Sequence, residues 1–275
     1  MRSKELFPAV FSRHARSYQQ RQDCLRRQGG LRARLLLIDA VEAAPGDCIL
    51  DLACGPGTIT LELAQRVAPD GQAVGIDLAP GMLEAAQARA SAGLAVRFEL
   101  MDMEELRFPD ASFDAVTCGH GLQFVPDLDR ALAQARRVLR AGGRFATTVP
   151  YESSGLAESI VSRAAGDRLP PLPEAPDRAV TRAIVADQDD FRAHVQRAGF
   201  GDVRVRVIEE VQRWASAAEL IGFASAWWVL AARLDQVSAR DRAEILAEAQ
   251  RALEAERGPG PIESTVSSLL LLAAA

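Results

Sequence analysis

The segment Ile49–Thr58 constrains the fold more than any other part of the chain. Its apolar residues lead to Asp51, and a loop of small residues that includes Gly55 and Gly57 follows before an amphipathic segment begins. This order predicts a strand, a tight turn and a helix. Glycine has no Cβ, so the turn can adopt unusual dihedral angles and a ligand can approach its backbone. Such a crevice, beyond the carboxyl end of a strand in an open α/β sheet, is the usual ligand site.

Further apolar runs alternate with helical patterns, which predicts a mostly parallel sheet with helices on both faces. The candidate strands are Gln72–Asp77, Ala95–Met101, Phe113–Cys118 and Arg144–Pro150. Two later runs, Val203–Val207 and Ile262–Leu272, are predicted to pair antiparallel to each other. They would complete a seven-stranded α/β sheet.

The other segments predict helical additions to one compact domain. Four prolines cluster after residue 169, and a capping-box pattern begins at Ser216. The expected parts are an N-terminal helical flap (1–45), a ligand-binding core (46–150), a lid insertion (151–186), a helical insertion (216–258), and the closing helix and strands of the core (187–215 and 259–275). The N-terminal part has an alternative interpretation, which is a surface helix packed on the sheet edge.

The helix that begins at Ser216 carries two adjacent tryptophans. Trp227 continues an apolar stripe with Phe223, so we expect Trp227 in the core. Neighbouring residues of a helix point in different directions, and Trp228 should therefore face another surface. That surface would be a substrate cavity or a subunit contact, and the alternative is a partly exposed side chain without a role.

Composition limits the kinds of partner. The formal net charge is -5, whereas binding of nucleic-acid phosphates needs a basic face. The four cysteines form no C-x-x-C pair and no zinc-spaced cluster, which favours a reduced cytoplasmic setting without a metal site. The N-terminus lacks a signal-peptide pattern, and the apolar run Leu269–Ala275 is shorter than the ~20 residues of a membrane span. We expect a cytoplasmic monomer or homodimer with no nucleic-acid or membrane partner.

Acidic residues end the second and third predicted strands. Asp77 lies 20 positions after Gly57, where a carboxylate can accept hydrogen bonds from both hydroxyls of a ribose. It can also cap the helix that starts near Pro80, and the two roles are compatible. Asp102 can accept a hydrogen bond from an adenine amino group while Met103 covers the ring. The alternative for Asp102 is capping of its own loop.

Four segments in order, with their separations, resemble one enzyme family. They are ILDLACGPGT (49–58), VGIDLAPGML (74–83), LMDMEELRFPDASFDAV (100–116) and GLQFVPDLDRALAQARRVLRAGGRF (121–145). This part of the chain resembles the class I S-adenosylmethionine (SAM)-dependent methyltransferases. It is most similar to the group of the ubiquinone and menaquinone C-methyltransferases and many natural-product methyltransferases. The resemblance implies a Rossmann-like fold, SAM as cofactor and a small, partly apolar metabolite as methyl acceptor.

The resemblance also implies residues for each part of SAM. The loop Ala53–Gly57 would border the methionyl part of SAM, and Asp77 would bind the ribose hydroxyls. Leu78 and Met82 would flank the adenine ring, and Asp102 and Met103 would meet the edge of that ring. The backbone of Cys118 and Gly119 would receive the methionyl amino group, and Tyr18 would approach the methionyl carboxylate. The full expected cofactor-binding set is Tyr18, Asp51, Ala53, Cys54, Gly55, Gly57, Asp77, Leu78, Met82, Asp102, Met103, Cys118, Gly119 and Gln123.

The catalytic residues are less constrained. The loop after the fourth strand lacks the Asn/Asp-Pro-Pro-Tyr motif of DNA-base and glutamine methylation, and Gln123-Phe124 stands where some relatives have a histidine pair. His120 follows that strand between two glycines and titrates in a range that suits proton removal. His14 and Tyr18 would approach the same point if the flap closes. Alternatively, His120 only packs against SAM, or no base is used, and O-, N- and C-methylation all stay open.

Two other functions share parts of the pattern. A nicotinamide-dependent oxidoreductase also uses a glycine loop and an acid on the second strand. Its G-x-G-x-x-G pattern, started at Gly55, would meet Thr60 at the third glycine position. A non-catalytic protein that keeps the SAM fold is the second alternative.

Overall fold

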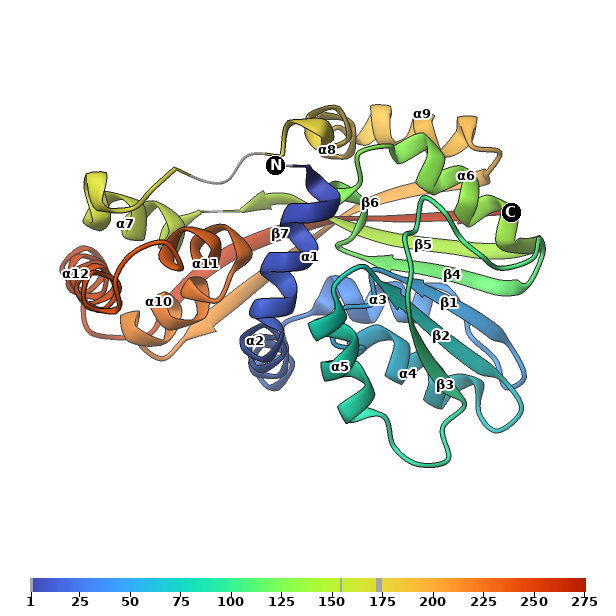
Figure 1. Cartoon of the computed structure of the whole chain (residues 1–275), viewed down its shortest axis with the longest axis horizontal. Coiled ribbons are helices and arrows are strands. Elements are labelled where there is room, and N and C mark those ends of the chain that lie inside the picture. The colour runs from blue at the N-terminus through green and yellow to red at the C-terminus, as the bar shows by residue number, and fades with distance from the viewer. Residues whose placement is uncertain (1, 154, 172–174) are drawn as a thin grey trace.

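The computed structural model describes residues 2–153, 155–171 and 175–275, except for the side chain of residue 153. Its centre is a seven-stranded sheet of order β3-β2-β1-β4-β5-β7-β6 (Figure 1). The strands are β1 (Cys48–Leu52), β2 (Gln72–Asp77), β3 (Val96–Leu100), β4 (Phe113–Gly119), β5 (Leu139–Ser153), β6 (Gly201–Trp214) and β7 (Ile262–Ala274). Only β7 runs antiparallel to its neighbours β5 and β6. The predicted fold class is confirmed.

Helices cover both faces of the sheet and extend beyond it. The helices of the described residues are α1 (Ser3–Arg13), α2 (Ala15–Arg27), α3 (Arg32–Ala40), α4 (Thr58–Val67), α5 (Pro80–Arg89), α6 (Leu128–Val138), α7 (Leu156–Ala165), α8 (Ala179–Ala186), α9 (Gln188–Arg197), α10 (Ala217–Ser225), α11 (Trp228–Leu234) and α12 (Ala239–Arg257). Three short 3-10 turns are η1 (Leu122–Phe124), η2 (Gly166–Arg168) and η3 (Pro176–Arg178). The N-terminal part breaks at His14 as well as after α2, and α8 was not expected. Pro173 lies outside the described residues.

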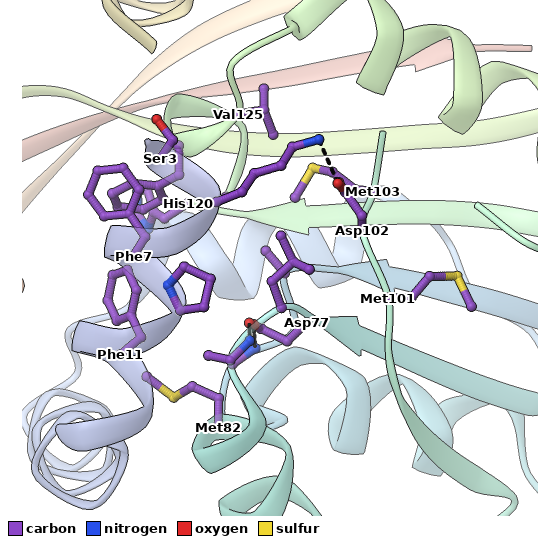
Figure 2. Close-up of a pocket in the computed structure, with 18 of the residues that line it drawn as sticks. Ser3, Phe7, Phe11, Asp77, Met82, Met101, Asp102, Met103, His120 and Val125 are labelled. Carbon is purple, nitrogen blue, oxygen red and sulfur yellow. Dashed lines mark hydrogen bonds and ion pairs between the residues drawn. The ribbon is translucent and has the colours of Figure 1, made fainter. Parts of the chain in front are cut away.

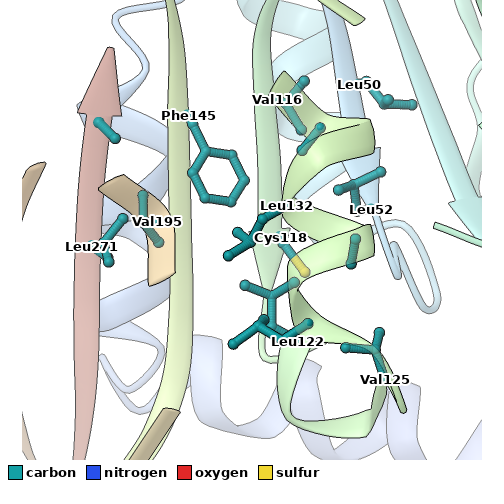
Figure 3. Packing of buried hydrophobic residues seen from close by; sticks show 14 of the residues in the cluster. Leu50, Leu52, Val116, Cys118, Leu122, Val125, Leu132, Phe145, Val195 and Leu271 are labelled. Atoms are coloured by element: carbon teal, nitrogen blue, oxygen red, sulfur yellow. The ribbon is translucent and has the colours of Figure 1, made fainter. Parts of the chain in front are cut away.

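Two apolar layers hold the helices on the sheet. On one face, α6 and α9 pack on the strands through Leu132 and Val195, beside Phe145 of β5 (Figure 3). On the other face, α3 and α4 bury Leu37 and Leu63 against β1 and β7. These stripes recur at helical spacing in the sequence, which is why the core elements were predictable.

The strands β6 and β7 extend past β5 and carry a second group of helices. The helices α7, α10 and α12 enclose a separate core with Trp214 at the end of β6, and this side chain is 1% exposed. The Trp214 indole Nε1 donates a hydrogen bond to Ser264 Oγ of β7 at 2.9 Å. We call this group the helical lobe, and Figure 1 shows it at the left end of the sheet.

The two adjacent tryptophans differ from the prediction. The helix breaks between α10 and α11 with a bend of 79°, and Trp227 is the N-cap of α11. Trp227 is half-buried, whereas Trp228 is 7% exposed and packs its ring on Phe7 and Phe124. The expectation that Trp227 is the core residue was therefore wrong. A single helical period cannot describe residues on both sides of a bend.

Candidate active site

A pocket of about 790 Å³ lies beyond the carboxyl ends of β1, β2 and β4 (Figure 2). The loops after these strands form its floor. Helix α1 forms its cover with Ser3, Lys4, Phe7, Pro8 and Phe11, and Tyr18 of α2 adds to the wall. We call it the first pocket.

The glycine loop after β1 is held by Asp77. The backbone N–H of Gly55 donates to Asp77 Oδ2 at 2.9 Å, and the N–H of Ala79 donates to Oδ1 at 2.8 Å. Ala53 and Gly55 both have positive φ and both line the first pocket. Burial raises the pKa of Asp77, and the backbone donors act in the opposite direction. Asp77 therefore orders two loops and faces the pocket with its remaining lone pairs.

Three expected cofactor-binding residues lie beneath the pocket instead of on its wall. The carboxylate of Asp51 is buried and accepts hydrogen bonds from Thr60 at 2.6 Å and from Thr117 at 2.8 Å. Burial raises the pKa of Asp51 to about 6. The side chain of Cys54 is buried too, and a Cβ at Gly57 would lie 3.1 Å from Ala86 and from Phe98. These residues fix the position of the loop.

An apolar slot extends from Asp77 towards β3. Leu78, Met82 and Met103 line it as expected, and the structure adds Ala79 and Met101. Met101 was assigned to the third strand, but that strand ends at Leu100, so Met101 belongs to the loop.

Asp102 lines the slot and is bound on both oxygens. Its Oδ1 accepts from the N–H of Glu104 at 2.9 Å, so the loop-capping interpretation is correct for this oxygen. Its Oδ2 lies 2.6 Å from Lys4 Nζ of the cover, and Figure 2 draws this ion pair as the dashed line at Asp102. The same Lys4 Nζ also forms an ion pair with Glu104. The sequence analysis missed Lys4. Its spacing of three, four and seven residues from Phe7, Pro8 and Phe11 marks one helical face and could have identified it.

The chain leaves β4 through three residues that all line the first pocket, Gly119, His120 and Gly121. A Cβ at Gly119 would overlap Ile59, and one at Gly121 would lie 2.6 Å from Ala53. His120 has a positive φ of 58°, and its Nε2 lies 3.0 Å from Ser268 Oγ of β7. The expected contact residue Cys118 is fully buried and does not line the pocket.

The His120 ring is neutral near pH 7. Burial lowers the pKa of His120 well below 6.5, and the nearby positive charges of Arg34 and Arg21 lower it further. A neutral imidazole can accept a proton, so this state is compatible with the expected role as a base.

A second cavity of about 1900 Å³ adjoins the first pocket. It lies among α2, α7, α10, α11 and the extended parts of β6 and β7. His120 and Phe124 line both spaces. Gln123 lines only the second cavity, and its Nε2 donates to the His120 carbonyl at 2.7 Å. Gln123 thus holds the junction and does not reach the first pocket.

The two flap residues separate in the structure. Tyr18 lines the first pocket, and its hydroxyl accepts a hydrogen bond from Arg34 Nη2 at 3.2 Å. His14 Nε2 instead lies 2.8 Å from Asp235 Oδ2, and His14 lines neither space. Sequence analysis missed Arg34, because no motif marks a lone arginine on a surface helix.

Comparison with known proteins decides the family. A methyltransferase-domain model matches residues 49–143. Nocamycin O-methyltransferase of Saccharothrix syringae is 34% identical over 247 residues, which cover 83% of this chain and 85% of that protein. The chain belongs to the class I SAM-dependent methyltransferases.

Other similarities cover less of the sequence or only the fold. A demethylmenaquinone methyltransferase of Symbiobacterium thermophilum is 44% identical to this methyltransferase over 104 residues, which span 41% of that enzyme. The crystal structure of the YcgJ protein from Bacillus subtilis superposes with a TM-score of 0.55 at 19% identity, covering 88% of this chain and 97% of that one. The latter shows a shared fold.

The described residues contain neither a metal-binding cluster nor a single membrane-spanning helix. Within 2–153, 155–171 and 175–275, no group of three His, Cys, Asp or Glu side chains is arranged to hold a metal ion. In the same ranges no single helix has the length and apolarity to cross a membrane, and only the bent pair α10–α11, counted together, meets those criteria.

Proposed function

We propose that this methyltransferase transfers a methyl group from SAM in the first pocket to a small, partly apolar acceptor in the second cavity. The observation that carries the proposal is that the two spaces meet at His120 and Phe124. The smaller space has the carboxylate and the apolar slot of a nucleoside site. The larger one has a ring-rich wall that includes Tyr151, Phe223 and Trp227.

The residues of the first pocket fit SAM. The carboxylate of Asp77 is an acceptor for the ribose hydroxyls, and Leu78, Met82 and Met101 offer apolar surface to adenine. The glycine loop leaves its backbone approachable, because a Cβ at Gly55 would meet nothing within 4 Å. SAM would supply a methyl group bound to a sulfonium sulfur. The leaving group of the transfer is a neutral thioether. Little covalent assistance is therefore required of the protein.

The chain's own contribution is alignment and exclusion of water. The cover residues Lys4, Phe7 and Phe11 lie over the first pocket, and Gly121 packs closely on Ala53 in its floor. Alignment of two reactants can lower a barrier by ~7–11 kcal/mol. We assign this part of catalysis to α1 and to the loop after β4.

His120 is the residue that we propose for proton transfer. If its Nε2–H donates to Ser268 Oγ, its Nδ1 is unprotonated and can accept the proton of an acceptor hydroxyl or activated carbon. His14 is a weaker candidate than it was by sequence, because Asp235 holds its ring. Tyr18 stays a candidate because it lines the first pocket.

Similarity to named relatives supports the acceptor class. The relatives include a nocamycin O-methyltransferase and a demethylmenaquinone methyltransferase, whose names imply small acceptors with rings. We also propose a cytoplasmic location, which the four free cysteines support. For the oligomeric state we propose a monomer or a homodimer. Light scattering after size-exclusion chromatography measures the oligomeric state.

Calorimetric titration tests the cofactor assignment. We expect SAM and its product S-adenosylhomocysteine (SAH) to bind and NADH not to bind. Binding of NADH without SAM would favour the oxidoreductase alternative. Transfer of labelled methyl from SAM to members of a panel of small ring compounds with oxygen, nitrogen or carbon as the methyl acceptor then tests catalysis. Binding of SAM without any transfer across acceptors of all three types would favour the non-catalytic alternative.

A further inference from the structure

Arg21 of α2 lies against the second cavity in an unusual environment. Its guanidinium carbon is 4.2 Å from the ring centroid of Phe223 and 4.2 Å from that of Trp227. Its Nε and Nη1 are buried, and no described residue accepts a hydrogen bond from either atom. The two rings therefore hold the guanidinium in the cavity wall but leave buried donors unpaired.

Two further arginines of the second cavity lack a carboxylate partner. Arg34 and Arg178 line this cavity and donate hydrogen bonds to the neutral oxygens of Tyr18 and Gln123, respectively. No described carboxylate forms an ion pair with Arg21, Arg34 or Arg178. Three arginines of the cavity wall therefore have no ion-pair partner among the described residues.

The wall of the second cavity also includes three glutamates, and none of them forms an ion pair with Arg21, Arg34 or Arg178. Glu210 accepts a hydrogen bond from the N–H of Ala33 at 2.6 Å, so one of its oxygens caps α3. Glu152 and Glu158 are exposed residues of the rim. Solvent screens such exposed charges far more than it screens a buried guanidinium.

An unpaired buried donor has a cost that a bound anion would remove. Leaving such a group unsatisfied destabilises the folded protein, and the effect is larger when the group is charged. Burial, with the charge of Arg34 adding to it, lowers the pKa of Arg21 to about 10, while Tyr18 acts in the opposite direction. The side chain is still charged at neutral pH, so an oxyanion is the chemical group that this environment lacks.

We propose that the methyl acceptor is an anion, in which a carboxylate or another delocalised oxyanion on an apolar or ring-containing body binds Arg21. The inference rests on the proposed function, and it names the charge class of that acceptor. The rings of Phe223 and Trp227 orient the guanidinium, and the acceptor's apolar body packs on the wall of the second cavity. A neutral molecule of the same shape would leave the Arg21 donors unpaired.

A matched pair of fluorescent probes tests the charge preference. The two probes are 8-anilinonaphthalene-1-sulfonate and the neutral N-phenyl-1-naphthylamine, which share a ring system and differ by the sulfonate. Energy transfer from the tryptophans reports binding near Trp227 and Trp228. We expect the wild-type protein to bind the anionic probe at least about tenfold more tightly than the neutral one.

Variants then test whether Arg21 causes the preference for the anionic probe. Arg21→Gln should reduce the ratio of the two affinities to near one, and Arg21→Lys should restore part of it. Arg27→Gln changes the same charge at an exposed position of the same helix and should leave the ratio unchanged. SAH affinity serves as the test of folding in each variant.

The alternative is that Arg21 only packs α2 against α10. Equal binding of the two probes by the wild type would overturn the proposal, whatever the variants do. A folded Arg21→Gln protein with the wild-type ratio would overturn it as well. Failure of SAH to bind the wild type would reject the proposed function instead, so the two failures are distinguishable.

Discussion

At the scale of single residues, Asp77 combines two functions in one carboxylate. Its two oxygens accept backbone hydrogen bonds from Gly55 and Ala79, and the same group faces the first pocket. One side chain therefore orders the glycine loop and supplies the acceptor that we propose for ligand recognition.

Replacement of Asp77 by alanine should weaken SAM binding at least tenfold. A lost hydrogen bond to a charged group costs roughly 1.5–3 kcal/mol, and the glycine loop would lose its anchor too. Calorimetry with SAM and SAH measures the effect, and far-UV circular dichroism checks the fold. Asp110→Ala, at an exposed carboxylate that pairs with Arg137, is the control. Wild-type affinity in a folded Asp77→Ala protein would contradict the assignment.

The lowered pKa of His120 predicts how activity depends on pH. The ring must be neutral to accept a proton, and its pKa lies well below 6.5. Activity that depends on His120 should therefore persist as pH falls through 6.5 and decline only at lower pH. The measurement is kcat/KM against pH with an acceptor that is found to be methylated.

The matching variant is His120→Gln. With an acceptor that needs deprotonation, kcat should fall by roughly 10²-fold or more, while SAH affinity should change little. The acidic limb of the profile should also disappear. An enzyme that keeps full kcat would move the role to Tyr18 or to no residue at all.

At the scale of elements, α1 connects the first pocket to distant segments of the chain. It covers the first pocket with one face, and the ring of Phe7 packs on Phe124 of η1 and on Trp228 of α11. Arg178 of η3 lies 4.7 Å from the Phe7 ring centroid. Four segments that are distant in sequence thus share a single aromatic cluster.

Phe7→Ala should loosen α1 selectively. Truncation of a buried phenylalanine typically costs ~3–5 kcal/mol, and here the loss falls on contacts that hold the cover. Hydrogen exchange should become faster over Ser3–Arg13 and stay unchanged over β1 and β2, and SAH should bind more weakly. Leu35→Ala, at an exposed leucine of α3, is the control. Unchanged exchange in α1 would show that other contacts hold it.

The elements also show what the sequence could and could not predict. The glycine loop and Asp77 follow from local strand–turn–helix patterns, whereas the family resemblance implied Leu78 and Met82. Lys4, Arg21 and Arg34 reach the site from helices that carry no motif, and only the packing of α1–α3 brings them there. The tryptophan assignment failed because a bend between α10 and α11 interrupts the helical period that the prediction assumed.

At the scale of the whole molecule, β6 and β7 join the core to the helical lobe. The strand β6 runs from the sheet edge into the lobe, and β7 returns from the lobe to lie beside β5. Within the lobe they pair from Val211 with Thr265 to Trp214 with Ile262. The lobe supplies one side of the second cavity. Its position relative to the first pocket is therefore fixed by two continuous strands.

Because of this continuity, the core and the lobe should unfold together. All three tryptophans, Trp214, Trp227 and Trp228, belong to the lobe or its border with α1. Tryptophan fluorescence and far-UV circular dichroism should therefore give the same urea midpoint, as a two-state transition requires. Leu253→Ala in the lobe core should shift both midpoints equally. A fluorescence transition at lower urea would show that the lobe unfolds by itself.

The position of β7 between β5 and β6 has a consequence for protein synthesis. The edge strand β6 is translated first, and its hydrogen-bonding partner becomes available only after residues 215–261 have been added. At ribosomal rates of ~5–20 residues per second, this interval lasts roughly 2–10 s. During it, β6 is an unpaired strand that could join a neighbouring nascent chain. The charged side chains of Arg204, Arg206 and Glu209 oppose such pairing, as charges on edge strands generally do.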